Sequence, residues 1–492
     1  MNFSTLDYVR QHADEDVRML ALRGTKDPDV DLTLALQQIQ GRQTARQKLP
    51  SWAANDAILY PPHLNMEQCS SEATARYKLA VARRLLASLP SQPASPASPP
   101  NLTCLPSQPS SPASPPNLTC LPSYAATSLQ PNLTSLPSLP ASPASPPNLT
   151  SRPSYAATSS QPSTPSLAPH FTTLLDLTGG LGVDFAFMQQ AFDAATYVEL
   201  SPGLFAIATQ NFATLGLQVS THNTDAATIL HATTHVTLAF LDPARRDNHG
   251  ARTYAISDCT PDILTLKDEL LHKADFVLLK LSPMLDWRKA VSDLGPQTVR
   301  EVHVISVNNE CKELLILLQS SPTTSPTLHC VNLPDDLEFK TPLFNNTLAK
   351  NGAGIKPSFP LEGPEGTFLY EPNASIMKAG CFEALAAHYA IAPLSHDSHL
   401  FISPRPIDDF PGRHFLITAT TSLNKRDLKT ALRGITHANI TTRNFPLSAP
   451  ALRQRLKFAD GGDTYIFATT LADGAHILLV CKKSRKPSIC DC

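Results

Sequence analysis

The spacing of hydrophobic positions changes three times along the chain. In residues 1–88 it is helical: in SSEATARYKLAVARRLLASL, a pair of serines precedes apolar residues at positions 75, 79, 81, 85 and 86, which fall near one helix face. The basic residues of this segment fall largely on other faces: Arg76, Lys78, Arg83 and Arg84. Further helices are expected over 5–22 and 28–48. The sequence therefore predicts an N-terminal helical domain.

Residues 89–168 show almost no sustained apolar periodicity. SQPASPASPPNLTCLP, at 91–106, recurs almost unchanged at 107–122, and a third near copy occupies 138–153. Arg152 is the single charged residue of the stretch, and many of the 45 prolines of the chain lie in it. Prolines at this density block helix and sheet ladders, and such repeats bury too little apolar surface to offset the entropy of ordering. We expect a disordered linker that carries no chemistry.

After residue 169 short apolar runs alternate with helical segments. Strands are expected in FTTLLDL, ATYVEL, LQVSTHN, VTLAFLD and ADFVLLKL, with helices between the first three. VREVHVISV and CKELLILLQ are joined at Asn308, Asn309 and Glu310, which predicts a hairpin. The fold class is therefore α/β: a doubly wound, Rossmann-like parallel sheet closed by an antiparallel hairpin, over 169–320.

The region from about 410 has a different pattern, in which strands and helices mix without a long parallel series. RHFLITAT, ANITTRNF, TYIFATT and HILLVCKK read as strands and NKRDLKTALRGI and ALRQRLKF as helices, so we expect a small α+β domain over 410–486. Residues 411–492 contain thirteen Lys and Arg against five Asp and Glu, a net charge of +8 in a chain whose total is −2. This basic charge is equally consistent with a solvated surface and with a nucleic-acid contact.

Composition indicates where in the cell the protein is expected. The first twenty residues carry acids where a secretory signal would carry an apolar core, and no apolar run approaches the length of a transmembrane helix. The ten cysteines are scattered without a CxxC pair. We expect a cytoplasmic protein without a membrane partner or a bound metal.

The glycine-rich stretch LLDLTGGLGVD follows the first strand of the α/β region. Open parallel sheets bind ligands at the carboxyl ends of their strands, so this loop is a candidate ligand site. A dinucleotide fingerprint needs a third glycine that GGLGVD lacks, and a P-loop needs a lysine that does not follow. Acids also follow the next three strands, at Glu199, Asp225 and Asp242. One such acid could be a simple helix cap, but acidic residues after each of four successive strands indicate a nucleoside-type cofactor.

These motifs resemble class I S-adenosylmethionine-dependent methyltransferases, and more narrowly the Bacteroidetes proteins that carry a ferredoxin-like segment and a THUMP-like domain. The resemblance rests on MEQCSSEATARYK, DLTGGLGVDFAFM, DPARRD, FLYEPNASIMKAGCFEALA, DSHLF, FPGR and NITTRNFPLSAPALRQRLKFADGGDTYIFATTL. It covers nearly all of the chain outside the linker and implies a ferredoxin-like connecting region over 321–409. It also implies S-adenosyl-L-methionine as the cofactor, with Glu199 at the ribose and Asp225 at the adenine. The methionine part would be lined by Asp176, Thr178, Gly179, Gly180, Gly182 and Asp184.

The motif after the fourth strand is the candidate catalytic loop. Enzymes that methylate exocyclic amines commonly have a stacking aromatic residue here, whereas Asp242 and Pro243 are followed by Ala244, Arg245 and Arg246. Asp242 is the candidate group to accept a proton or orient the nucleophile, with Pro243 shaping the loop. Arg245 is placed with them as a group that stacks on a base or clamps a phosphate, and Arg246 as a substrate contact. A structural ion pair of the arginines with Asp247 is the alternative.

The expected function is methylation of tRNA or rRNA. Glu67 and Gln68 are placed over the pocket by the family resemblance alone, and a plain helix start at Ser70 or Ser71 would explain this stretch equally well. Contacts to structured RNA are expected from the basic residues of the last domain: Arg443, Arg453, Arg455 and Lys457. Methylation of a protein or small molecule, and RNA binding without catalysis, are the alternatives.

Overall fold

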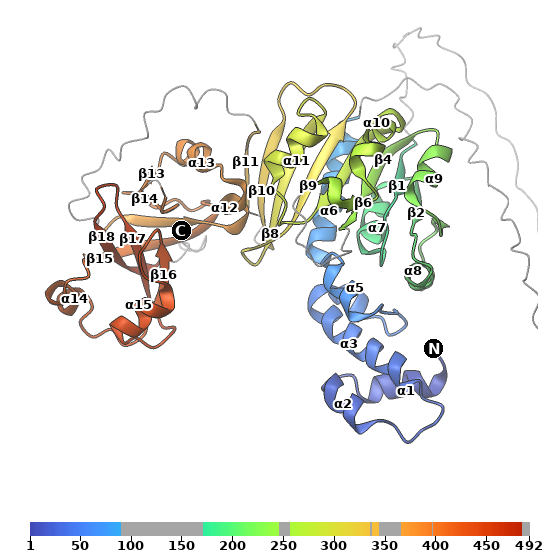
Figure 1. The fold of residues 1–492 in the computed structure, drawn as a ribbon, viewed down its shortest axis with the longest axis horizontal. Coiled ribbons are helices and arrows are strands. Elements are labelled where there is room, and N and C mark those ends of the chain that lie inside the picture. Colours follow the sequence, from blue (N-terminus) through green and yellow to red (C-terminus); the bar gives the residue numbers. More distant parts are fainter. Residues whose placement is uncertain (90–170, 246–255, 335–336, 344–365, 396, 485–492) are drawn as a thin grey trace, which may run out of the picture. The chain divides into compact units, whose positions relative to one another are not determined.

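The computed structural model describes residues 1–89, 171–245, 256–334, 337–343, 366–395 and 397–484 (Figure 1). Nearly all of the predicted linker, together with Arg246, lies outside the described residues. Within these ranges no helix is both long enough and apolar enough to cross a bilayer.

The N-terminal region is helical, as predicted. Its helices are α1 (Phe3–Gln11), α2 (Val17–Arg23), α3 (Leu32–Lys48), α4 (Pro50–Ala53), α5 (His63–Gln68) and α6 (Glu72–Ala87). The helical stretch expected over 5–22 is present but divided into two helices, α1 and α2. The chain leaves α1 at His12, and a new helix starts where Asp16 accepts hydrogen bonds from the N–H groups of Arg18 and Met19. Ser71 caps α6 by accepting from the Thr74 N–H.

The central sheet has nine strands in the order β11-β10-β8-β9-β7-β4-β1-β2-β3. Their bounds are β1 (Thr173–Asp176), β2 (Ala194–Val198), β3 (Ser220–His222), β4 (Val236–Leu241), β7 (Ala274–Leu281), β8 (Val299–Val307), β9 (Glu310–Gln319), β10 (Thr327–Leu333) and β11 (Leu337–Pro342). Strands β3, β2, β1, β4 and β7 are parallel, and β9 is antiparallel to both β7 and β8. The predicted hairpin is present, and Asn308 and Asn309 take the positive φ values (51° and 62°) that a two-residue turn requires.

Helices cover both faces of this sheet. One face packs on α6, α7 (Val183–Met188) and α8 (Pro202–Thr214) through Leu238 and Phe240 of β4. The other packs on α9 (Ala226–Ala232), α10 (Ile263–Lys273) and α11 (Trp287–Leu294) through Ala239 and Leu241 of the same strand. The doubly wound architecture is thus confirmed. It places the carboxyl ends of β1, β2, β4 and β7 at one edge.

The C-terminal part of the chain, drawn from orange to red in Figure 1, forms a second sheet. This sheet has seven strands in the order β13-β14-β12-β15-β18-β17-β16. Its strands are β12 (Phe368–Pro372), β13 (Ala392–Pro393), β14 (Phe401–Ser403), β15 (Gly412–Thr421), β16 (Asn439–Arg443), β17 (Thr464–Thr470) and β18 (His476–Lys483). Its helices are α12 (Ala374–Ala379), α13 (Phe382–Tyr389), α14 (Lys425–Ala431) and α15 (Ala449–Leu456). The predicted connecting region and last domain therefore share one sheet, and β10 and β11, which the sequence placed in the connecting region, extend the central sheet instead.

Candidate active site

The glycine loop turns from β1 into α7. Gly180 and Gly182 have φ values of +56° and +81°, which favour glycine. A Cβ atom on Gly179 would lie 1.9 Å from the Tyr197 ring, and one on Gly182 would lie 2.4 Å from the Phe212 ring. A Cβ on Gly180 would meet no atom within 4 Å. Two of the glycines thus allow close packing behind the loop, and Gly180 has open space beside it.

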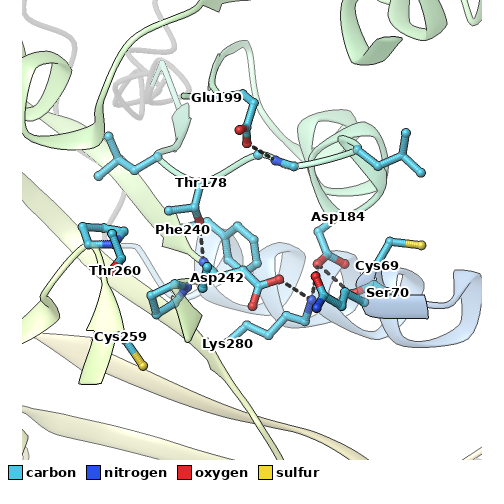
Figure 2. A pocket seen from close by; sticks show the side chains of 18 of the residues that line it. Cys69, Ser70, Thr178, Asp184, Glu199, Phe240, Asp242, Cys259, Thr260 and Lys280 are labelled. Carbon is cyan, nitrogen blue, oxygen red and sulfur yellow. Dashed lines mark hydrogen bonds and ion pairs between the residues drawn. The ribbon is translucent and has the colours of Figure 1, made fainter. Parts of the chain in front are cut away.

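A cavity of about 830 Å³ lies at this edge of the sheet (Figure 2). Its walls come from the loop 177–184, from the segments 224–227, 242–244, 259–261 and 280–283, and from Asn65, Gln68, Cys69 and Ser70. The last four residues belong to the N-terminal helical region, at and beside the junction between α5 and α6. The volume lies in the range of small-molecule sites, and the helical region contributes part of the wall.

Glu199, directly after β2, lines this cavity with both carboxylate oxygens held in place. Its Oε2 accepts from the Gly180 N–H (2.8 Å) and its Oε1 from the Ser201 N–H (2.7 Å). Each carboxylate oxygen has two lone pairs, so each keeps one for a ligand. Two neighbouring hydroxyl groups, as in a ribose, fit this carboxylate.

Asp225 also lines the cavity, at the start of α9. Its carboxylate caps that helix by accepting from the Thr228 N–H (2.9 Å) and hydroxyl (2.6 Å), and these bonds hold its pKa below the usual value. The side chain is exposed and ionised, with lone pairs left for an amino group.

Asp176 is buried beneath the loop and is not part of the cavity wall. Its Oδ1 accepts from the Thr178 N–H (3.0 Å), and its Oδ2 has no hydrogen-bond partner among the described residues. Burial raises the pKa of this carboxyl well above its usual value, and the carboxylates of Asp184, Asp242 and Glu199 raise it further.

Asp242, after β4, is fixed from two sides. Its N–H donates to the Thr178 hydroxyl (2.5 Å), which ties it to the glycine loop. Its Oδ2 accepts from the ammonium of Lys280 (2.5 Å), near the end of β7 (Figure 2). The Asp242 side chain remains 38% exposed, whereas that of Lys280 is only 9% exposed. Lys280, which sequence reasoning missed, therefore holds the candidate catalytic carboxylate from within the protein.

A row of alternating charges continues behind Lys280. Asp184 Oδ2 lies 3.5 Å from Lys280 Nζ, and its Oδ1 lies 3.1 Å from Lys78 Nζ. Lys78 Nζ lies 2.6 Å from Glu313 Oε1 on β9. The Ser70 hydroxyl also donates to Asp184 (2.7 Å). Asp184 lines the cavity, but these groups hold both of its oxygens.

The sequence-based placement of Lys78 away from the apolar face is wrong, because its side chain is completely buried. The stem lies on the packed face of α6, and the ammonium reaches the carboxylates of Asp184 and Glu313. Burial raises the pKa of Asp184, but the two nearby lysines outweigh it and lower that pKa overall. The pKa of Glu313 is raised, chiefly by burial.

Of the remaining candidate residues near the cavity, some line it and one does not. Pro243 and Gln68 line it, whereas Glu67 does not: its side chain is 60% exposed and lies 3.8 Å from His63. The backbone of β5 (Ala244–Arg245) pairs with β6 (Cys259–Thr260), which brings 259–261 into the wall.

The four basic candidates of the C-terminal domain also differ from one another. Arg443 donates to Glu371 Oε1 (2.8 Å), and Arg453 donates to the Ala438 carbonyl (2.8 Å) and pairs with Asp460 (2.6 Å). Arg455 and Lys457, at the end of α15, are exposed. The first two arginines therefore connect parts of the domain, and the last two face solvent.

Comparisons with known proteins agree with this geometry. Residues 412–483 match the family model described as THUMP domain-like, and residues 368–411 match the model described as a ferredoxin-like domain. The fold is similar to a crystal structure assigned as a methyltransferase from Porphyromonas gingivalis W83, with 26% identity, 98% of each chain covered and a TM-score of 0.70. In sequence, the chain is 23% identical over 325 residues to an uncharacterised S-adenosylmethionine-dependent methyltransferase from each of two Mycobacterium tuberculosis strains. That match covers 63% of this chain and 81% of the relatives.

Proposed function

We propose that this chain, a class I S-adenosylmethionine-dependent methyltransferase with a ferredoxin-like segment and a THUMP-like domain, methylates structured RNA such as tRNA or rRNA. The observation that carries the proposal is the combination of a cavity lined by Glu199, Asp225 and Asp242 with a C-terminal domain of THUMP-like type and basic composition. THUMP-like domains suggest RNA by analogy of fold.

The cofactor residues follow from the cavity. S-adenosylmethionine supplies an electrophilic methyl group when it is bound. Glu199 would accept from both ribose hydroxyls with its two free lone pairs, and Asp225 would accept from the adenine amino group. The open space beside Gly180 would admit the methionine part.

The protein's contribution to the reaction is mainly positioning. Thr178 connects the cofactor loop to Asp242, so a hydrogen bond fixes the acceptor residue relative to the donor site. Asp242 orients the acceptor and takes its proton, and residues at the α5–α6 junction form part of the cavity wall. Correct alignment of two bound reactants accounts for much of the rate of a direct transfer.

Calorimetry with S-adenosylmethionine tests the cofactor site. Glu199→Ala is expected to weaken binding strongly, since it removes the acceptor for two hydroxyls. Glu310→Ala is the matched control, because that carboxylate is 73% exposed and lies at the hairpin turn. No binding to the unaltered chain, or equal binding by both variants, would contradict the assignment.

Nucleoside mass spectrometry of tRNA and rRNA from a deletion strain tests the substrate. One methylated nucleoside is expected to disappear and to return with the intact gene, but not with a gene carrying Asp242→Ala. An unchanged set of nucleosides, with cofactor binding intact, would favour a protein or small-molecule acceptor. One observation favours this second candidate: Arg443 pairs with Glu371 and Arg453 with Asp460, which reduces the basic surface left for RNA.

A further inference from the structure

The atom that receives the methyl group can be inferred from what the acceptor side of the cavity offers. Asp242 and Lys280 lie together there, one carboxylate and one ammonium with their charged atoms 2.5 Å apart (Figure 2). Both residues line the cavity. An acceptor beside Asp242 therefore meets a hydrogen-bond acceptor and a cationic hydrogen-bond donor together.

The Lys280 ammonium has donor capacity left. It makes one hydrogen bond, to Asp242, and its other carboxylate neighbour, Asp184, is 3.5 Å away. An ammonium has three N–H groups, so at least one can point to an atom in the cavity. Burial by itself would lower the pKa of Lys280, but Asp242, Asp184 and Glu313 raise it, so the group stays protonated and cannot act as a base.

A hydroxyl group fits this pair and an exocyclic amine does not. A hydroxyl oxygen has two lone pairs and one proton: one lone pair can accept from Lys280, the other can attack, and the proton can go to Asp242. An amine nitrogen has a single lone pair, which it needs for the attack, and it becomes cationic on methylation. A buried ammonium stabilises negative charge that develops on oxygen and opposes positive charge on nitrogen.

The described walls also offer no exposed aromatic ring on which a flipped base could stack. Among the described residues that line the cavity, Phe240 is the single aromatic one, and it is 1% exposed. Enzymes that act on a flipped base hold it between aromatic or apolar side chains, and here only apolar ones, such as Leu200 and Leu281, are available. A ribose hydroxyl can be presented by the RNA backbone without such stacking.

We infer that the methyl acceptor is the 2′-hydroxyl of a ribose in RNA, with its oxygen at Lys280 and its proton directed to Asp242, an inference that rests on the function proposed above. In the transfer the hydroxyl proton passes to the Asp242 carboxylate and the ribose oxygen bonds to the methyl carbon. The bond between that carbon and the sulfonium sulfur breaks, and its electron pair stays on sulfur. Asp242, which is partly exposed, then releases the proton to solvent.

The site of methylation is tested with the full chain, tRNA and rRNA transcripts that carry no modifications, and S-adenosylmethionine with a labelled methyl group. Alkali cannot cleave a phosphodiester next to a methylated 2′-oxygen, so the label is expected in alkali-resistant dinucleotides. Replacing the target nucleotide with its 2′-deoxy form should abolish labelling. Label in a base, or labelling of the deoxy substrate, overturns the inference while RNA methylation itself stands. No labelling of any RNA, with cofactor binding intact, overturns the proposed function as well.

Variants test the role of Lys280 separately. Lys280→Met is expected to lower kcat by about 100- to 1000-fold, the usual loss for one oxyanion donor, with little change in the affinity for S-adenosylhomocysteine. Lys280→Arg, which keeps a cation, should recover part of the rate. Lys289→Met is the matched control, since that lysine is 57% exposed and pairs with Asp293 on α11. Because Lys280→Met removes a buried charge and could fail to fold, Asp242→Asn provides the second variant, and its methylation should also fall. Unchanged kcat in a folded Lys280→Met protein overturns the role of Lys280.

Discussion

Replacing Lys78 with methionine removes a positive charge from the protein interior while nearly preserving side-chain volume. The ammonium is fully buried between Asp184 (3.1 Å) and Glu313 (2.6 Å). At an effective dielectric constant near 20, each attraction is worth about 5 to 6 kcal/mol before the cost of desolvation. Burying the ammonium costs several kcal/mol in return. The variant keeps two buried carboxylates and loses their counterion, so we expect the free energy of unfolding to fall by about 3 to 5 kcal/mol.

Urea denaturation followed by circular dichroism measures this loss. Lys289→Met, which breaks an exposed pair on α11, should cost no more than about 0.5 kcal/mol. Adding Glu313→Gln to Lys78→Met should restore part of the stability, since the buried carboxylate that loses its ion-pair partner Lys78 is then replaced by a neutral amide. A loss below about 1 kcal/mol for Lys78→Met, or perfect additivity of the two changes, would refute the idea of a tightly coupled buried network.

Three further predictions concern other parts of the molecule. Burial lowers the pKa of His303 to about 4 from 6.5 despite its bond to a carboxylate, so its neutral form stabilises the fold above pH 6.5. That contribution, about 3 kcal/mol, should be lost as the pH falls from 6.5 through 4, and urea midpoints of His303→Gln should depend less on pH in this window. Gly179→Ala should destabilise the protein far more than Gly180→Ala in thermal unfolding, because only the first puts a methyl group into a ring. A double change of Arg455 and Lys457 to glutamine should weaken RNA affinity at low salt and reduce its salt dependence, whereas salt-independent affinity would contradict a basic RNA contact.

Much of the central fold follows from local pattern. The alternation of apolar runs and helices predicts that β1 to β4 follow one another along the chain as strands. The asparagines after β8 predict the hairpin because they tolerate the positive φ of its turn. The glycine loop and Glu199 also lie where the sequence places them, at the carboxyl ends of adjacent parallel strands. These features depend on neighbouring residues and on one rule of sheet geometry.

The charged row could not be predicted in this way. Three elements far apart in the sequence carry these charges: Lys78, Lys280 and Glu313. Taken alone, each resembles an ordinary surface charge or a single charged residue within an apolar segment. The usable signal was Lys280, a lysine near the end of the apolar strand ADFVLLKL, since a buried lysine requires a carboxylate partner. The partners themselves depend on how α6 and β9 pack, which a linear pattern does not contain.

The arrangement of charges connects the carboxylate at the mouth of the cavity with those buried behind it. Along Asp242, Lys280, Asp184, Lys78 and Glu313, each charge has only opposite charges as its nearest neighbours. Burial raises the pKa of Glu313 at the closed end of the row, whereas the two lysines lower that of Asp184 overall. Lys280 therefore joins the buried row to the carboxylate that faces the acceptor, and a proton taken from the acceptor enters at the partly exposed end of the row.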